Sequence, residues 1–230
     1  MNLSNAAETH LLQLLFTNTD WTNIGDAGGL RGSAAAGSFY ISLHTADPGE
    51  AGDQTTSEAT FTSYVRVAVA RSGAGWTVSN NQAVNAALIQ FAPCTGGANT
   101  ITHWGLGRAS AGAGELLFKA PLTVSGAGPL LYTATAADLL TVPGHTFSVN
   151  DTLQSFAVLG ITAPAGITDG VNYFVKTVSG NDITISTTLG GATLDITAAG
   201  AAMLIKTTTL AVSVNIQPQF AAGVLKILDE

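Results

Sequence analysis

The chain has 230 residues, 46% of them apolar, so we expect one domain, or one domain with a small second one, around a packed core. Only 10% of the residues are charged, and eight basic against fifteen acidic residues give a net charge of −7. No cluster of Lys or Arg occurs, which argues against nucleic acid as a partner. No stretch approaches the roughly eighteen apolar residues of a membrane span, and the N-terminal residues carry neither a basic segment nor a cleavage signal. We therefore expect a protein that is neither membrane-inserted nor classically secreted.

Residues 3–16 carry the amphipathic pattern of a helix. Ser4 or Asn5 can cap this helix, and Glu8 lies in its first turn. Its apolar face is formed by Leu11, Leu12, Leu14, Leu15 and Phe16. Because a helix of this length is marginal in water unless it packs, we expect it to dock on its own domain or on another subunit.

From about residue 39 the apolar residues alternate with a period of two, which is typical of β-strands. Strands are expected at 39–43, 63–71, 87–91, 102–107, 115–124, 207–216 and 223–228. Segments rich in Gly, Pro, Asn and Asp separate them. The aromatic residues expected in the core are Phe39, Tyr40, Tyr64, Trp76, Phe91, Trp104 and Phe118. The pattern predicts a mainly β fold, an antiparallel β-sandwich or barrel with one N-terminal helix.

Residues 137–206 have a rhythm of their own, with a predicted hairpin whose bend is Ser-Gly-Asn-Asp at 179–182. A β module of roughly seventy residues is large enough to fold alone. We therefore predict a main β domain formed by residues 1–136 and 207–230, with residues 137–206 as an inserted small β domain. A single sheet system that includes all strands is the alternative that the periodicity leaves open.

His44, Asp47 and Glu50 are spaced three apart, which raises the possibility of a metal site or of acid/base chemistry together with His103. However, Asp47 precedes Pro48 in a Pro-Gly turn, where its side chain can accept a hydrogen bond from the turn backbone. A calcium loop would need more oxygen ligands, and zinc would need a second close His or Cys. We interpret this segment as a turn between strands.

The other polar candidates also favour structural roles. His10 lies on the helix, His145 in a turn and His103 in a strand, and Cys94, which has no second cysteine to pair with, is expected to be a small buried residue. Four carboxylates could flank a cleft as in a glycosidase, but nothing in the sequence specifies the pair. They are Glu50, Asp53, Glu58 and Glu115. We therefore predict no catalytic, cofactor-binding or metal-binding residues and a protein that is not an enzyme.

Several segments together resemble a known family. They are LHTADPGEAG (43–52), YVRVAV (64–69), ITHWGLG (101–107), GELLFKAPL (114–122) and FAAGVLKILD (220–229). This series is similar to tailed-bacteriophage and prophage structural proteins usually labelled phage tail fibre or minor tail protein. The likeness runs from Leu3 to about Val124 and from Gln217 to Asp229. Residues 137–206 resemble a separate β module that is spliced into diverse phage virion proteins.

The resemblance implies a non-enzymatic component of the virion, assembled in the host bacterial cytoplasm. The expected function is that of a tail-associated fibre, tip or adaptor protein that acts through protein–protein contacts in a symmetric assembly. Its partners would be other virion proteins and copies of itself. One alternative is a capsid decoration protein that stabilises the head. Another is a carbohydrate-binding receptor module, with a host surface glycan as the partner of residues 137–206.

Overall fold

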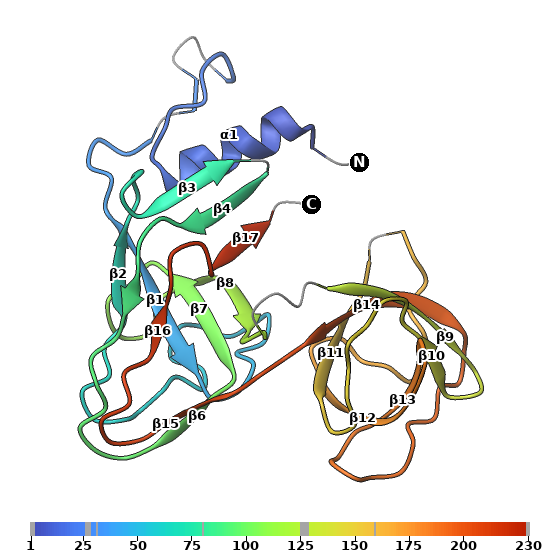
Figure 1. Ribbon diagram of the computed structural model, residues 1–230. Coiled ribbons are helices and arrows are strands. Elements are labelled where there is room, and N and C mark those ends of the chain that lie inside the picture. The colour runs from blue at the N-terminus through green and yellow to red at the C-terminus, as the bar shows by residue number, and fades with distance from the viewer. Residues whose placement is uncertain are drawn as a thin grey trace. The chain divides into compact units, whose positions relative to one another are not determined.

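The computed structural model describes residues 3–25, 29–30, 32–79, 81–124, 129–158 and 160–228. In these residues the chain is mainly β, with antiparallel strand pairs and one helix near the N-terminus (Figure 1). The predicted fold class is confirmed. The chain divides into two compact units, unit 1 from Met1–Ala120 with Leu210–Glu230 and unit 2 from Pro121–Thr209.

Helix α1 spans Asn5–Phe16, two residues shorter at its start than predicted. Ser4 is its N-cap, because the hydroxyl accepts a hydrogen bond from the Ala7 amide at 3.4 Å. At the other end the guanidinium of Arg71 donates to the carbonyls of Leu14 and Leu15 at 2.9 and 2.6 Å. A cation at this position satisfies the last helical carbonyls and interacts favourably with the helix dipole.

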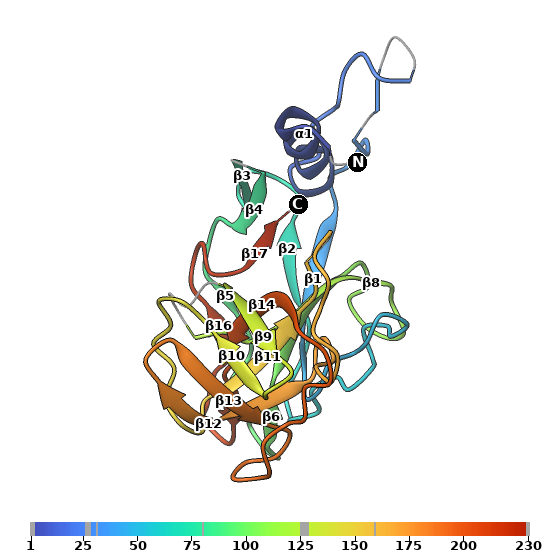
Figure 2. The same cartoon turned by 90° about the vertical axis from the view of Figure 1, so that its right-hand side faces the viewer.

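Helix α1 packs on the hairpin of β3 (Trp76–Ser79) and β4 (Gln82–Asn85), and it lies beside them in both Figure 1 and Figure 2. Phe16 is fully buried, with its ring 4.8 Å from that of Trp76 and 5.4 Å from that of Phe39 in edge-on geometry. The helix was expected to dock on its own domain or on another subunit, and it packs on its own unit. The sequence pattern missed the β3–β4 hairpin, whose strands have only four residues each.

The main sheet of unit 1 has four strands in the order β2-β1-β7-β8. They are β1 (Ser38–His44), β2 (Val67–Ala70), β7 (His103–Gly107) and β8 (Leu116–Pro121). In the antiparallel register of β1 with β7, His44 lies opposite His103 and Ile41 opposite Leu106. The segments 43–52, 64–69, 101–107 and 114–122 each contribute residues to this sheet, whereas 220–229 contributes to others.

Short strand pairs complete unit 1. Strand β5 (Ile89–Gln90) pairs with β16 (Gln219–Phe220), β6 (Asn99–Ile101) with β15 (Leu210–Val212), and β17 (Lys226–Leu228) joins β4 in a three-stranded sheet with β3. All the strands predicted for this unit exist, but those at 63–71, 87–91, 115–124, 207–216 and 223–228 are clearly shorter than expected. The C-terminal residues thus return to the unit in which the chain begins.

Unit 2 is a closed six-stranded barrel in the order β10-β13-β12-β11-β14-β9. Its strands are β9 (Leu130–Thr135), β10 (Leu139–Thr141), β11 (Thr152–Phe156), β12 (Asn172–Ser179), β13 (Asp182–Ser186) and β14 (Gly200–Lys206). The hairpin predicted around 179–182 is present as β12–β13, with Gly180 at φ +62° in its two-residue turn. Closure pairs every strand on both sides and leaves no free edge.

The structure divides the chain earlier than the predicted start of the inserted domain at residue 137. Strand β9 pairs with both β14 and β10, so the barrel would be open without it. At the base of the unit, Thr123 bridges Thr207 and the Thr208 amide donates to the Leu122 carbonyl at 2.8 Å. The chain therefore enters and leaves unit 2 through two adjacent antiparallel segments.

Candidate functional site

His44, the first member of the spaced set, is fully buried and both of its ring nitrogens are engaged. Its Nδ1 lies 2.8 Å from the carbonyl oxygen of Thr56, and its Nε2 lies 2.8 Å from the hydroxyl of Ser42. Because a carbonyl can only accept, Nδ1 carries the proton and Nε2 accepts from Ser42. Metal ligation or proton transfer by His44 would break these bonds, so the imidazole holds the loop after β1 against the sheet.

Asp47 has the turn role predicted for it. Its Oδ1 accepts from the Gly49 amide at 2.9 Å and also from the ammonium of Lys119 at 2.9 Å. Burial by itself would raise the pKa of Asp47, but the Gly49 hydrogen bond and the Lys119 ion pair outweigh it and hold that pKa below its usual value. Glu50, whose side chain is 95% exposed, lies 3.2 Å from the same ammonium.

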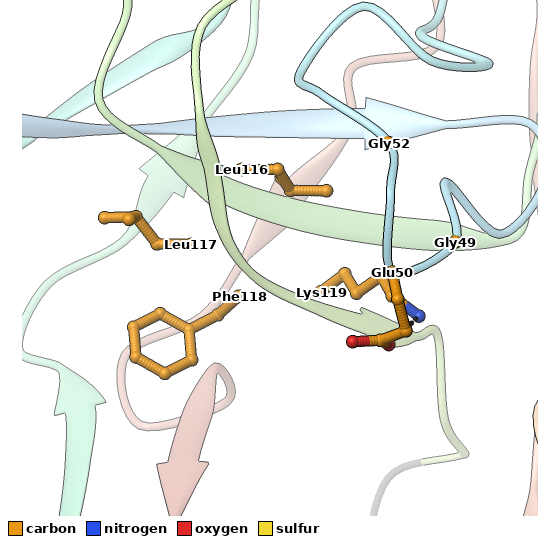
Figure 3. Close-up of a pocket in the computed structure, with 7 residues that line it drawn as sticks. All are labelled: Gly49, Glu50, Gly52, Leu116, Leu117, Phe118 and Lys119. Atoms are coloured by element: carbon orange, nitrogen blue, oxygen red, sulfur yellow. Dashed lines mark ion pairs between the residues drawn. The ribbon is translucent and has the colours of Figure 1, made fainter.

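These side chains do not converge on a common point with His44. Glu50 and Lys119 instead border a pocket of about 250 Å³ (Figure 3). Lys119 lines it together with Leu116, Leu117 and Phe118 of the same strand, β8, and Glu50 lines it from the loop that contains Gly49 and Gly52. Within the part of the chain that the structure describes, no three His, Cys, Asp or Glu side chains lie close enough together to hold a metal ion.

His103 faces His44 across the β1–β7 pair. Its Nδ1 lies 2.8 Å from the hydroxyl of Thr102, and its buried Nε2 has no hydrogen-bond partner among the described residues. Burial lowers the pKa of both imidazoles. Both imidazoles are therefore neutral at pH 7, because two positive charges on adjacent rings would be poorly hydrated in this buried position.

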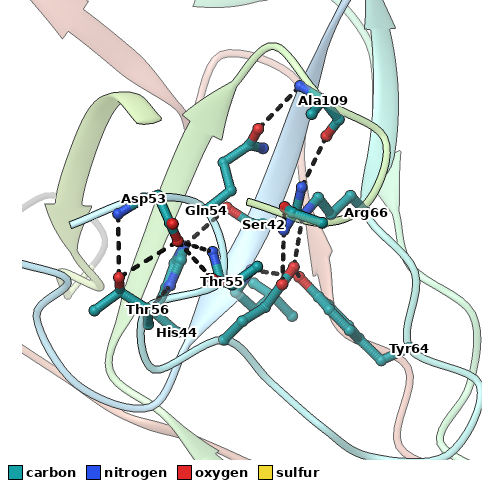
Figure 4. A network of polar contacts seen from close by, with 12 residues as sticks. Ser42, His44, Asp53, Gln54, Thr55, Thr56, Tyr64, Arg66 and Ala109 are labelled. Carbon is teal, nitrogen blue, oxygen red and sulfur yellow. Dashed lines mark hydrogen bonds and ion pairs between the residues drawn. The ribbon is translucent and has the colours of Figure 1, made fainter. Parts of the chain in front are cut away.

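The densest polar cluster surrounds Arg66, which follows a loop and precedes β2 (Figure 4). Its Nε and Nη2 donate to the two carboxylate oxygens of Glu58 at 2.6 and 2.8 Å. The remaining donors reach the carbonyls of Ala109 and Gly112 at 3.0 and 2.9 Å. The Arg66 side chain is only 2% exposed, and its pair with Glu58 is bidentate. The bonds to the two carbonyls tie the loop before β2 to the loop between β7 and β8.

Tyr64 extends this cluster toward β1. Its hydroxyl donates to Glu58 at 2.9 Å and accepts from the Leu43 amide at 3.0 Å. Burial and the neighbouring Glu58 carboxylate raise the pKa of Tyr64, so the phenol remains protonated. Glu58 thus accepts three hydrogen bonds and has no free role as a general acid or base.

Gln54 is fully buried against Gly107 at the end of β7 and Gly114 in the loop that follows it. Its side-chain oxygen accepts from the Ala109 amide at 2.9 Å, and its backbone amide donates to the Gly114 carbonyl at 2.9 Å. A Cβ at Gly107 or Gly114 would overlap the Gln54 side chain, so the glycines there leave room for it. The Gly-Ala-Ser loop after β7 is shaped by this packing.

The remaining candidates are dispersed. The ring of His10 stacks on Trp21 at 5.6 Å, and that of His145 stacks on Phe147 at 5.0 Å. Cys94 is buried, and its thiol lies 3.3 Å from the Gly96 carbonyl. Asp53 accepts from the Thr55 amide and hydroxyl, and Glu115 forms an exposed pair with Arg108 at 3.2 Å.

Sequence reasoning did not identify Arg66, Tyr64 or Gln54 as parts of one cluster. The signal for Arg66 was present, since an arginine within the apolar run YVRVAVA is buried only if it is paired. Its charged partner, Glu58, is only eight residues away, but the carbonyls of Ala109 and Gly112 that complete the cluster lie more than forty residues away and were not accessible from the sequence. Most polar groups of the cluster are paired, although the buried Nε2 of Gln54 has no hydrogen-bond partner among the described residues. The physical effect of the cluster is to hold the loop between β1 and β2 against the loop between β7 and β8.

No helix in the described parts of the chain is long and apolar enough to cross a membrane. No curated protein matches the chain. A family profile does match: its description is Podophage GP4 fiber I protein gp80, and it covers residues 2–129, more than half of the 230 residues. The matched span includes α1 and β1 to β8 and ends immediately before β9 begins at Leu130. The chain therefore belongs to this family of phage fibre proteins.

Proposed function

We propose that the protein is a tail-associated structural subunit of a phage particle, acting as a fibre, tip or adaptor through contacts with other tail proteins and with copies of itself. The observation that carries this proposal is the fibre-family match over residues 2–129, which spans most of unit 1. The low charged fraction of 10% supports it, because a surface that is buried against neighbours needs little charge for solubility.

A structural function without catalysis is supported by the chemistry of the polar clusters. In His44, Glu58 and Arg66, the hydrogen-bonding groups that a reaction would use are already engaged in bonds that hold loops. Asp47 and Lys119 likewise neutralise each other at 2.9 Å. The carboxylates that remain exposed are dispersed over the surface.

The two units suggest a division of labour. Unit 1 carries the family sequence and would attach the protein to the tail, whereas the barrel strands, β9 to β14, lie beyond the matched residues and would form an added module. Tyr132, Phe147 and Tyr173 are buried in the barrel core. They are consequently not available as a platform on which a sugar ring could stack.

The test is to locate the protein in purified particles by immunogold electron microscopy. An epitope tag inserted after Leu189 would be accessible, since that side chain is 62% exposed in the loop that follows β13. Gold confined to the tail is the expected result, with untagged particles as the control. Gold over the head would instead favour capsid decoration and would contradict the proposal.

A further inference from the structure

The main sheet of unit 1 ends in two edge strands, β2 and β8, on opposite sides of β1 and β7 (Figure 1). Strand β2 has the sequence Val-Ala-Val-Ala, without the Lys, Pro or bulge with which proteins commonly protect an exposed edge. Uncharged edges of this kind pair readily with another strand. We therefore ask which strand could pair with each of these two edges.

The outer side of β2 offers free backbone groups. The Arg71 amide donates to the Gly37 carbonyl at 3.1 Å, so these two residues continue the β1–β2 pairing as a hydrogen-bonded pair. Along an antiparallel strand, residues whose backbone groups point toward the partner strand alternate with residues whose backbone groups point away from it. By this alternation the amide and carbonyl of Ala68 point away from β1. Neither group forms another backbone hydrogen bond among the described residues, and Ala68 is exposed.

A groove of about 180 Å³ runs along this edge. One side is formed by Val67–Ala70, and the other by Ala74, Gly75 and the segment 87–89, which includes the exposed Leu88. None of the lining side chains is charged or polar. An inserted strand would therefore have to be uncharged where it contacts the groove, since an unpaired charge there would lose its hydration without compensation.

Strand β8 meets this requirement. Leu117 is 37% exposed, and the pocket of about 250 Å³ beside β8 leaves its apolar side chains accessible (Figure 3). The single cation of the strand, Lys119, is already paired within its own chain with Asp47 at 2.9 Å. Strand β8 itself consequently brings no unpaired charge to an interface, and Glu50, 3.2 Å from the same ammonium, lies on the neighbouring loop with its side chain 95% exposed.

We propose that copies of this chain associate head to tail, with β8 of one copy pairing with β2 in the groove of the next. Strand direction favours this arrangement. Each strand in the order β2-β1-β7-β8 runs opposite to its neighbour, with β7 and β8 joined as a hairpin in which Arg108 donates to Glu115 at 3.3 Å. Strands β2 and β8 therefore run in opposite directions, and a copy related by rotation about an axis along the strands places them side by side in antiparallel orientation.

Head-to-tail pairing also covers both edges of the sheet. A two-fold pairing of β2 with β2 would leave β8 of each copy uncovered, whereas the heterologous contact extends to a closed ring or an open filament. This inference rests on the proposed assembly function and names the surface through which copies of the chain would meet.

The first test is the oligomeric state of the full chain by sedimentation velocity. Wild-type protein is expected to form species larger than a dimer, and Ala68→Lys is expected to be monomeric with an unchanged urea midpoint. Val214→Lys serves as the matched control, because Val214 is 54% exposed and lies outside the groove. A wild-type monomer at every concentration, or equal loss of oligomer in both variants, would overturn the proposal.

The second test identifies the pairing. Ala68→Cys and Leu116→Cys proteins, whose substituted side chains lie on the same face of the sheet, are prepared separately and oxidised mildly, alone and mixed, with wild-type protein as the control for the buried Cys94. Disulfide-linked dimers are expected in the mixture only. Dimers of Ala68→Cys alone would mean two-fold β2 pairing and would refute the head-to-tail arrangement. A monomer found on the tail would refute this inference alone, whereas an intact oligomer found on the head would refute the proposed location alone.

Discussion

Removing one partner of the buried ion pair between Glu58 and Arg66 is expected to destabilise unit 1, and the substitution Glu58→Gln tests this. Glutamine keeps the size of the side chain and one acceptor oxygen, but it removes the negative charge. Arg66, 2% exposed, would then retain the carbonyls of Ala109 and Gly112 while its charge lost the Glu58 carboxylate, its salt-bridge partner. The folded state would hold a buried cation without a counter-ion.

Breaking a buried pair by removing one partner costs about 3–5 kcal/mol, because the remaining charge stays desolvated. The Glu58 side chain is 17% exposed and the glutamine oxygen can still accept one hydrogen bond, so we expect the lower end, about 3 kcal/mol. Glu115→Gln is the matched control. Its pair with Arg108 has side chains 58% and 70% exposed, and such surface pairs contribute at most about 1 kcal/mol.

Urea unfolding followed by tryptophan fluorescence isolates the relevant unit. All three tryptophans, Trp21, Trp76 and Trp104, belong to unit 1, so the barrel does not contribute to the signal. A lower midpoint at an unchanged slope would report the loss of stability. Equal and small effects of the two substitutions would refute the reasoning.

A double substitution to apolar residues, Glu58→Leu with Arg66→Met, separates charge burial from packing. It should recover most of the loss caused by Glu58→Gln, because no charge then remains to be desolvated. If the double variant is instead less stable than Glu58→Gln, the hydrogen bonds to the loops contribute more than the compensation of charge.

Replacing Arg71 by Met removes its hydrogen bonds to the end of α1 and should cost about 1–3 kcal/mol with faster amide exchange in the helix, while Arg71→Lys should lose less; unchanged exchange would contradict the capping role. Acidification should destabilise unit 1 below the ordinary histidine pKa of about 6.5, since burial lowers the pKa of His44 and His103 and the unfolded chain binds protons first. This contribution to stability is fully present above that pH and is lost as the pH falls toward the lower pKa of the folded state. Replacing both histidines by Gln should make the stability, followed by tryptophan fluorescence, nearly independent of pH between 7 and 5; an unchanged pH dependence would contradict the attribution. Deleting residues 123–207 and joining the ends with Asn-Gly should leave a cooperative tryptophan transition, because the flanking segments are already adjacent and antiparallel; loss of that transition would mean that the units share one core.

The sequence by itself determined features that depend on near neighbours in the chain. The helix capped by Ser4, the turn in which Asp47 accepts from Gly49, and the hairpin around 179–182 each need contacts over only a few residues. Composition and alternation were likewise sufficient to predict a mainly β fold. These signals are local because capping, turn geometry and strand alternation are properties of the adjacent backbone.

Only the tertiary structure decided which distant segments meet. It joined Arg66 to the loop between β7 and β8, placed β9 in the barrel rather than with the main sheet, and returned β17 to β4 across more than a hundred residues. Strand alternation indicates which side chains face a core, but it does not specify the neighbouring strand. That choice depends on loop closure and on the packing of the whole unit, so the buried ion pair and the two open sheet edges become visible only in the folded chain.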